Sequence, residues 1–282
     1  MSKKNMLLGV ATGKVGDLVF YRAGGEQRTR TRVTPANPRS YNQQVQRSKI
    51  AEIVNAYRAM SVLLKETFPN RPTKQSTFNA FSAANMVKAP TLTRSEAKIG
   101  IFNPAPFFIA KGSLKTPFDN QAVAANAFTF TCGVIEDAAP TDEPSLFEAL
   151  HALHPCCVVE GSKMVIVVVN NGVNGMGDTG SIKMIPVNLS SEGDKTLADL
   201  GITATKESGT NQLKLSVAVE SVTSIAGVVI LTPTNEGKWD CNNAQMVLGT
   251  GAETKYLMYY SGIGVEVAAE SYNAAAPSCL LG

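Results

Sequence analysis

The sequence predicts an α+β protein in which an N-terminal β-hairpin and two helices are followed by an antiparallel β-sandwich. Three observations support this fold class. A glycine turn joins two strand-like runs near the N-terminus, an apolar stripe with helical spacing follows residue 40, and short strand-like runs alternate with turn residues from about residue 99. Many short strands without long helices between them are typical of a sandwich. We expect a basic arm over 1–40, a helical segment over 41–98 and a sandwich domain over 99–282.

The predicted hairpin consists of two strand-like runs, Asp17–Arg22 and Gln27–Val33, on either side of the residues AGGE. The glycines of AGGE suit a tight hairpin turn. A turn centred on Gly24 and Gly25 places four pairs of residues opposite each other: Arg22 and Gln27, Tyr21 and Arg28, Val19 and Arg30, and Asp17 and Arg32.

Side chains alternate between the two faces of a strand, so Arg28, Arg30 and Arg32 share one face of the hairpin. Leu18 and Phe20 point to the other face, which we expect to be buried. The arginine face has two interpretations, because guanidinium groups bind both phosphates and carboxylates. Tyr21 is its single aromatic residue for base stacking, and the chain has no nucleic-acid-binding motif. This favours pairing with an acidic patch on a neighbouring subunit.

Two helices are predicted between the hairpin and the sandwich, after a proline-containing linker that ends at Ser40. The first helix covers 41–68, starts at a capping box formed by Ser40 and Gln43, and ends before Pro69. Its apolar stripe consists of Ile50, Ile53, Val54, Tyr57, Met60 and Leu64. Arg47, Arg58 and Lys65 should form a column beside this stripe. The second helix runs from Lys74 to about Met86, with Phe78 and Phe81 as apolar anchors.

The C-terminal region contains seven strand candidates and two short helices. The strands are Ala127–Val134, Cys157–Asn170, Ser181–Leu189, Gln212–Val219, Ile225–Leu231, Lys255–Tyr260 and Ile263–Ala269. The helices are Glu143–His154 and Asp194–Leu200.

The charge of the chain is distributed unevenly along its length. Residues 1–74 contain 14 lysines and arginines against 4 aspartates and glutamates, a net charge of +10, whereas residues 75–282 contain 12 against 19, a net charge of −7. This polarity suits an oligomer in which the basic arm of one subunit lies on the acidic body of the next, and it also suits an arm that contacts nucleic acid.

These patterns predict the residues that take part in assembly. The basic residues expected to contact acidic groups or other anions are Arg22, Arg28, Arg30, Arg32, Arg39, Arg47, Arg58 and Lys65. The residues expected to make hydrophobic assembly contacts are Leu18, Phe20, Tyr21, Ile53, Tyr57, Phe78 and Phe81.

A metal site is not predicted, although His151 and His154 lie close to Cys156 and Cys157. Zinc needs four ligands in tetrahedral arrangement, adjacent cysteines rarely bind one ion together, and no second ligand pair completes the set. The five cysteines form no regular framework, so we expect reduced thiols.

A phosphate or calcium site is not predicted in the glycine-rich stretch Val165–Gly180. The stretch leads into another strand, whereas a dinucleotide site needs a helix directly after the glycines. Calcium binding by Asn170, Asn174 and Asp178 would rest on a single carboxylate, so a long loop is the better interpretation.

Catalysis, cofactor binding and membrane insertion are not predicted either. The chain has no G-x-S-x-G motif, and its two histidines are neighbours in sequence. The apolar run Met164–Val169 is far too short to span a membrane, and the N-terminus lacks the features of a signal peptide. We therefore expect a non-enzymatic protein without cofactor, made in the cytoplasm.

The N-terminal third resembles an uncharacterised family of proteins from Bacteroidetes and their phages, including crAss-like phages. The resemblance covers about residues 9–86 and lies in GKVGDLVFYR, RTRTRV, NPRSYNQQVQR and FNAFSAANM. It implies no reaction or cofactor, but it implies a virion or prophage setting with a variable β-rich C-terminal region.

Together these features predict a phage virion structural protein that forms a homo-oligomeric ring or layer in the neck or tail or on the capsid. Its expected partners are further copies of itself and other virion proteins, and it is assembled in the host cytoplasm. One alternative is a nucleic-acid-binding protein with its arm on packaged DNA. A second alternative is a bacterial binding module for another ligand.

Overall fold

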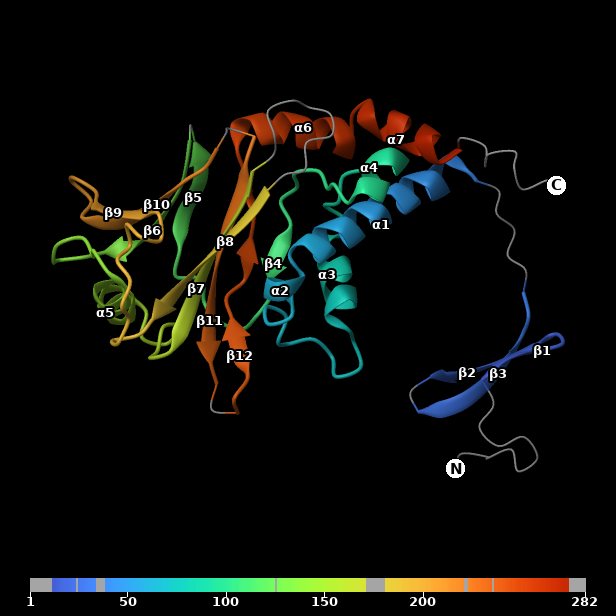
Figure 1. Ribbon diagram of the computed structural model, residues 1–282, viewed down its shortest axis with the longest axis horizontal. Coiled ribbons are helices and arrows are strands. Elements are labelled where there is room, and N and C mark those ends of the chain that lie inside the picture. Colours follow the sequence, from blue (N-terminus) through green and yellow to red (C-terminus); the bar gives the residue numbers. More distant parts are fainter. Residues whose placement is uncertain are drawn as a thin grey trace. The chain divides into compact units, whose positions relative to one another are not determined.

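A computed structural model of the chain forms two compact units, residues 1–40 and residues 41–282 (Figure 1). The structure describes residues 12–23, 25–33, 39–124, 126–170, 181–220, 223–234 and 236–273. Most of the predicted linker, the turn residue Gly24 and the central part of the predicted glycine loop lie outside these ranges. The predicted α+β class is confirmed, with strands first, helices next and several antiparallel sheets after them.

The first unit is a three-stranded antiparallel sheet with the order β1 (Gly13–Val15), β2 (Leu18–Ala23) and β3 (Glu26–Thr31). β2 and β3 form the predicted hairpin. β1 was not predicted, and it reaches β2 through a tight turn at Gly16, which has a φ of 56°. Glycine adopts this left-handed conformation without the penalty that a Cβ atom imposes.

The second unit contains two main antiparallel sheets. The first sheet has the order β5 (Asp119–Ala124), β6 (Ala127–Val134), β10 (Gln212–Ala218) and β9 (Ile202–Lys206). The second has the order β12 (Trp239–Cys241), β11 (Ile225–Pro233), β7 (Ser162–Asn170) and β8 (Ser181–Leu189), with β14 (Val247–Leu248) also paired to β11. A small third sheet joins β4 (Phe108–Ala110) and β13 (Ala244–Gln245).

The described part of the chain contains seven helices. They are α1 (Tyr41–Ala59), α2 (Ser61–Leu64), α3 (Thr77–Asn85), α4 (Arg94–Ile99), α5 (Glu143–Leu153), α6 (Thr250–Tyr260) and α7 (Gly264–Asn273).

The central strand β7 separates two hydrophobic cores. Met164, Ile166 and Val168 point toward the first sheet and join its core, while alternate residues such as Val165 and Val167 join a core that includes residues of α1, α2 and α3. Both faces of β7 are therefore buried, which explains why its sequence is continuously apolar. The result is three layers: the first sheet, the second sheet and a layer of helices (Figure 1).

The predicted sandwich is present as the two facing sheets, and α5 lies beside one edge of it. Leu146 and Leu150 of α5 are fully buried in the core between the sheets. The carboxylate of Glu143 accepts a 2.9 Å hydrogen bond from the backbone N–H of Asn188 in β8. At the other end of the helix, Leu153 lies close to Gly133 of β6. α5 thus contacts strands from both sheets.

Two predicted strands are helices in the structure. Lys255–Tyr260 belongs to α6, and Ile263–Ala269 belongs mostly to α7. Their apolar runs resemble short strands, but Gly264, Ala268 and Ala269 are buried at a helical spacing of four and five residues. These small residues let α7 pack closely beside α1 (Figure 1).

Three other predictions need correction. Asp194–Leu200 is not helical, because Thr196 pairs with Asp142 and a turn follows that is held by the side chain of Asp199. The predicted helix 41–68 is interrupted at Met60, so α1 and the short α2 replace it. The strand predicted from Cys157 begins only at Ser162, because a turn after α5 occupies the intervening residues.

Candidate assembly surfaces

The register of the N-terminal hairpin matches the predicted one. Val19 lies opposite Arg30, Tyr21 opposite Arg28, and Arg22 opposite Gln27. Beyond the last pair, the backbone N–H of Arg32 donates a 2.6 Å hydrogen bond to the carbonyl oxygen of Asp17. Ala23 pairs with Glu26, so the two strands are paired up to the ends of the two-residue turn that joins them.

The arginine face of the hairpin carries Lys14, Val19, Tyr21, Ala23, Glu26, Arg28 and Arg30, with Arg32 just beyond the end of β3, and all but the half-buried Val19 and Ala23 are exposed. Arg30 lies over the ring of Tyr21, and Arg28 is 3.6 Å from the carboxylate of Glu26. This is the single ion pair among residues 12–23 and 25–33. Lys14 joins the arginine face because it lies opposite Val19, a position that depends on the unpredicted strand β1.

The opposite face of the hairpin carries Val15, Leu18, Phe20 and Arg22. Phe20 is buried, as expected, but Leu18 is 47% exposed and Val15 is 66% exposed. Arg22 is exposed and lies on this face, apart from the other three arginines. This face thus offers apolar surface at one end and a positive charge at the other.

The other predicted basic residues are exposed. Arg47 and Arg58 lie on α1, whereas Lys65 follows α2 beyond the interruption at Met60. Arg47 donates a 3.3 Å hydrogen bond to the side-chain oxygen of Gln44. Arg39, which lies just before α1, has a positive φ of 50°.

Four of the predicted hydrophobic assembly residues belong to the internal core of the second unit. Ile53 and Phe81 are almost completely buried, while Tyr57 and Phe78 are half-buried. The ring of Tyr57 packs edge-on against Phe78 at 5.3 Å and lies 5.8 Å from Phe81. These side chains hold α1 against α3, so their apolar character is explained within one subunit.

The buried face of α1 contains a polar stripe that sequence reasoning missed. Gln44, Ser48, Glu52 and Asn55 are all buried, whereas Ile50 of the predicted apolar stripe is 46% exposed. The partner of this stripe is the irregular backbone on either side of α4, at Leu92 and over residues 101–103. Ser48 accepts from the N–H of Leu92 at 2.6 Å and donates to its carbonyl at 2.8 Å, and Asn55 donates to the carbonyl of Ile101 at 2.8 Å. Buried irregular backbone needs such partners, so this helix face is polar.

Glu52 lies at the centre of the polar stripe. One of its carboxyl oxygens accepts a 2.9 Å hydrogen bond from the backbone N–H of Asn103, and the other oxygen has no hydrogen-bond partner. Burial raises the pKa of Glu52 well above its ordinary value, against the opposing effect of the Asn103 N–H, and the nearby carboxylate of Glu96 raises it further. A protonated carboxyl group avoids the cost of a buried charge at this position.

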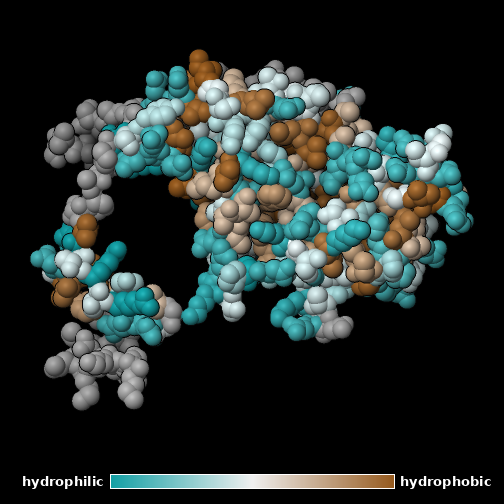
Figure 2. Space-filling view, turned by 180° about the vertical axis from the view of Figure 1, so that it is seen from behind, coloured by the Kyte–Doolittle hydropathy of each residue, from teal (hydrophilic) through white to brown (hydrophobic). Residues whose placement is uncertain are grey.

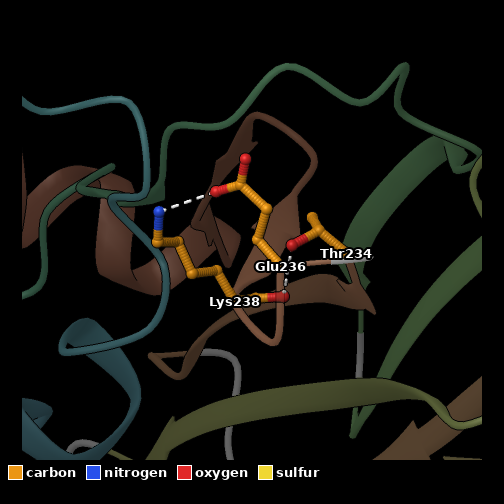
Figure 3. Close-up of polar contacts among 3 residues, drawn as sticks. All are labelled: Thr234, Glu236 and Lys238. Carbon is orange, nitrogen blue, oxygen red and sulfur yellow. Dashed lines mark hydrogen bonds and ion pairs between the residues drawn. The ribbon is translucent and has the colours of Figure 1, made fainter.

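A hollow of about 900 Å³ lies between the loop after α2 and the β11–β12 hairpin. It is lined by residues of both charge signs, including Lys65, Glu66 and Asp240, and by Trp239. Figure 3 shows its hairpin wall, where Lys238 contacts Glu236 at 2.8 Å and the hydroxyl of Thr234 donates to the carbonyl of Lys238. Both members of the ion pair are largely exposed, so it contributes little to stability.

The histidine and cysteine side chains are engaged by the protein itself. A ring nitrogen of His151 is 2.7 Å from the carbonyl of Val158, and one of His154 is 3.1 Å from the carbonyl of Cys132. Cys156 is exposed, whereas Cys157 is buried. Within the described residues, no group of three or more His, Cys, Asp or Glu side chains is placed to hold a metal ion. Burial raises the pKa of the Cys157 thiol.

The candidate calcium ligands Asn174 and Asp178 lie outside the described residues. Asn170, at the end of β7, is buried, and its side-chain oxygen accepts a 3.1 Å hydrogen bond from the hydroxyl of Ser224. This contact links β7 to the start of β11. Of the helices that the structure describes, none has both the length and the apolar character needed to cross a membrane.

Comparison with known proteins adds no relative: no family model matches the chain, and no curated protein does. The candidate surfaces therefore rest on the residues themselves. The arginine face combines exposed cations with apolar side chains, an arrangement that can bind a carboxylate-bearing protein surface or a phosphate backbone.

Proposed function

We propose that the protein is a phage virion structural protein that assembles into a homo-oligomeric ring or layer through its N-terminal arm, residues 1–40. The observation that carries the assembly role is the division of the chain into two units. Among the described residues, the two hydrophobic clusters of the second unit draw their members from Ile53 onward. The second unit therefore has hydrophobic cores of its own, and we propose that the arm binds another molecule.

Charge supports a second copy of the chain as the partner of the arm. Residues 1–40 contain 8 lysines and arginines against 2 acidic residues, a net charge of +6, whereas residues 136–220 contain 5 against 12, a net charge of −7. Opposite charges on two parts of one chain attract neighbouring copies and orient them. The virion setting itself rests on the resemblance of residues 9–86 to proteins of Bacteroidetes and their phages.

The competing proposal places the arginine face on packaged DNA. Lys14, Arg28, Arg30 and Arg32 form one basic surface, which is also suited to phosphates. Tyr21 is the single aromatic residue on that face, and Arg30 already covers its ring. We prefer assembly for this reason, and because the acidic partner surface is present in the same chain.

Deletion of residues 1–40 tests the assembly role. We expect the full-length chain to form an oligomer of defined mass by light scattering, and the shortened chain to be a folded monomer with a cooperative thermal transition. Mass spectrometry of purified virions should find the full-length chain in fixed copy number. A shortened chain that retains the full-length oligomer would show that the arm is not the assembly element.

A further inference from the structure

A groove of about 670 Å³ lies beside α5, between this helix and the segment that follows β6. Its apolar lining includes Val134, Ala149 and Leu153, and Val134 is 55% exposed although it is a large hydrophobic residue. Three carboxylates line the same groove, from Glu136, Asp137 and Glu148. Figure 2 shows hydrophobic atoms beside hydrophilic ones at the end of the second unit that α5 occupies.

The three carboxylates of the groove are exposed and have no ion-pair partner in the described part of the chain. No lysine or arginine lines the groove. Lys206 contacts the same segment: its ammonium group donates to the backbone carbonyls of Glu136 at 2.6 Å and Asp137 at 3.2 Å. Lys206 thus fixes the segment while both carboxylates remain available, so the groove combines apolar side chains with three exposed carboxylates.

We propose that this groove, defined by Glu136, Asp137 and Glu148 with its apolar lining, receives the arginine face of the hairpin from a second copy of the chain. The inference rests on the proposed assembly function and names the surface that the arm contacts. The arginine face has the complementary composition, because Val19 and Tyr21 lie among Arg28, Arg30 and Arg32. In the proposed contact, Val19 and Tyr21 pack on the apolar lining of the groove, and the arginines pair with its carboxylates.

The row of arginines is similar in length to α5, which forms one wall of the groove. Alternate residues of a strand are about 7 Å apart, so the arginines at 28, 30 and 32 extend over about 14 Å. The 11 residues of α5 extend over about 16 Å at the rise of an α-helix. A planar guanidinium group can bind a carboxylate through two parallel hydrogen bonds, which gives such a contact direction as well as strength.

The proposed contact joins two different surfaces, a hairpin on one subunit and a groove on the next. Such a head-to-tail contact repeats from subunit to subunit and closes into a ring when the rotation allows it. This agrees with a ring as the assembled form. The other possible occupants of the groove are a different virion protein and a surface of the neighbouring subunit other than its arm.

Charge reversal in full-length chains tests the proposal. One variant carries Glu136→Lys, Asp137→Lys and Glu148→Lys, a second carries Arg28→Glu, Arg30→Glu and Arg32→Glu, and a third carries all six changes. We expect each of the first two to raise the concentration needed for assembly by roughly 100-fold. The sixfold variant should recover the wild-type mass, because the charges again attract. Light scattering over a dilution series measures this.

The control reverses three exposed acidic residues away from the groove, Glu192→Lys, Glu266→Lys and Glu270→Lys, and should leave the oligomer unchanged. Thermal melts of every variant confirm that the fold is retained. If the arm variant dissociates but the groove variant keeps its mass, the arm docks elsewhere and the groove proposal is wrong, while the proposed function stands. If the arm variant also keeps its mass, the proposed function itself is wrong.

Discussion

The guanidinium group of Arg30 lies over the ring of Tyr21, with its central carbon 5.8 Å from the ring centroid. The two residues come from opposite strands of the hairpin, because Arg30 pairs with Val19 and Tyr21 pairs with Arg28. An exposed contact of this kind contributes about 0.5–1 kcal/mol and holds the guanidinium group on the arginine face. The guanidinium group of Arg30 is thereby held in position before any partner binds.

This placement predicts different effects for two single substitutions in the hairpin. Arg30→Ala should weaken self-association by about tenfold, because it removes one charged contact from the arginine face. Arg22→Ala is the matched control, since Arg22 is also exposed but lies on the opposite face. Sedimentation velocity over a range of concentrations measures both. Equal losses in the two variants would show that the face of the hairpin does not determine the contact.

Phe81 should contribute to stability rather than to assembly. It is fully buried, and its ring lies near those of Tyr57, Phe68 and Phe107. Phe81→Ala should therefore reduce the free energy of unfolding by about 3–5 kcal/mol. Phe78→Ala, at a half-buried site on the same helix, should cost less. Urea denaturation measures the loss. If Phe81→Ala dissociated the oligomer without changing the free energy of unfolding, Phe81 would be an assembly residue after all.

Glu52 should make stability depend on pH. Its pKa in the folded state is raised by burial, so the folded chain binds a proton that the unfolded chain releases at lower pH. The resulting stabilisation is complete below the unfolded pKa of about 4.3 and is lost as the pH rises through the folded pKa.

Glu52→Gln tests this pH dependence, because glutamine keeps the oxygen that accepts from Asn103 and cannot ionise. We expect the free energy of unfolding to fall less steeply from pH 5 to pH 8 in this variant than in the wild type. Glu66→Gln, which changes an exposed carboxylate, is the control and should leave the slope unchanged. The measurement is urea denaturation at several pH values, and parallel slopes for Glu52→Gln and the wild type would contradict the account.

Metal removal should leave stability unchanged. One ring nitrogen of His151 and one of His154 face backbone carbonyls, and among the described residues no group of three or more His, Cys, Asp or Glu side chains is placed to hold a metal ion. A structural zinc ion contributes strongly to folding free energy, so a strong chelator should lower the melting temperature if zinc is present. We expect no change by calorimetry, and stoichiometric zinc in the purified protein would refute this.

The local parts of the fold were predictable because their signals are local. Two glycines between β-branched and aromatic runs set the register of the hairpin, and the predicted bounds of Ala127–Val134 and Ser181–Leu189 agree with β6 and β8. One missed element also had a local signal: Thr93 and Glu96 form a capping box at the start of α4.

The polar stripe of α1 could not be predicted from periodicity. Ser48, Glu52 and Asn55 are buried because irregular backbone, distant in sequence, packs on them and needs hydrogen bonds. Similarly, the helical structure of α7 depends on its packing against α1, which is distant in sequence. Ala268 and Ala269 are small enough for this close packing. The groove beside α5 also depends on tertiary structure, since Glu136 and Glu148 meet there through the packing of a helix on a sheet.

The most direct test of the assembly proposal is the triple substitution Arg28→Ala, Arg30→Ala and Arg32→Ala in the full-length chain, followed by two measurements. Light scattering gives the oligomer mass, and a titration against salt gives the affinity for duplex DNA. We expect the variant to be a monomer, because carboxylates on the neighbouring subunit lose their partners at a cost of roughly 3–5 kcal/mol for a buried pair. The opposite result would contradict the assembly proposal: the variant keeps its oligomer but binds DNA more weakly. In that case the slope of DNA affinity against salt concentration should fall by about one for each arginine removed.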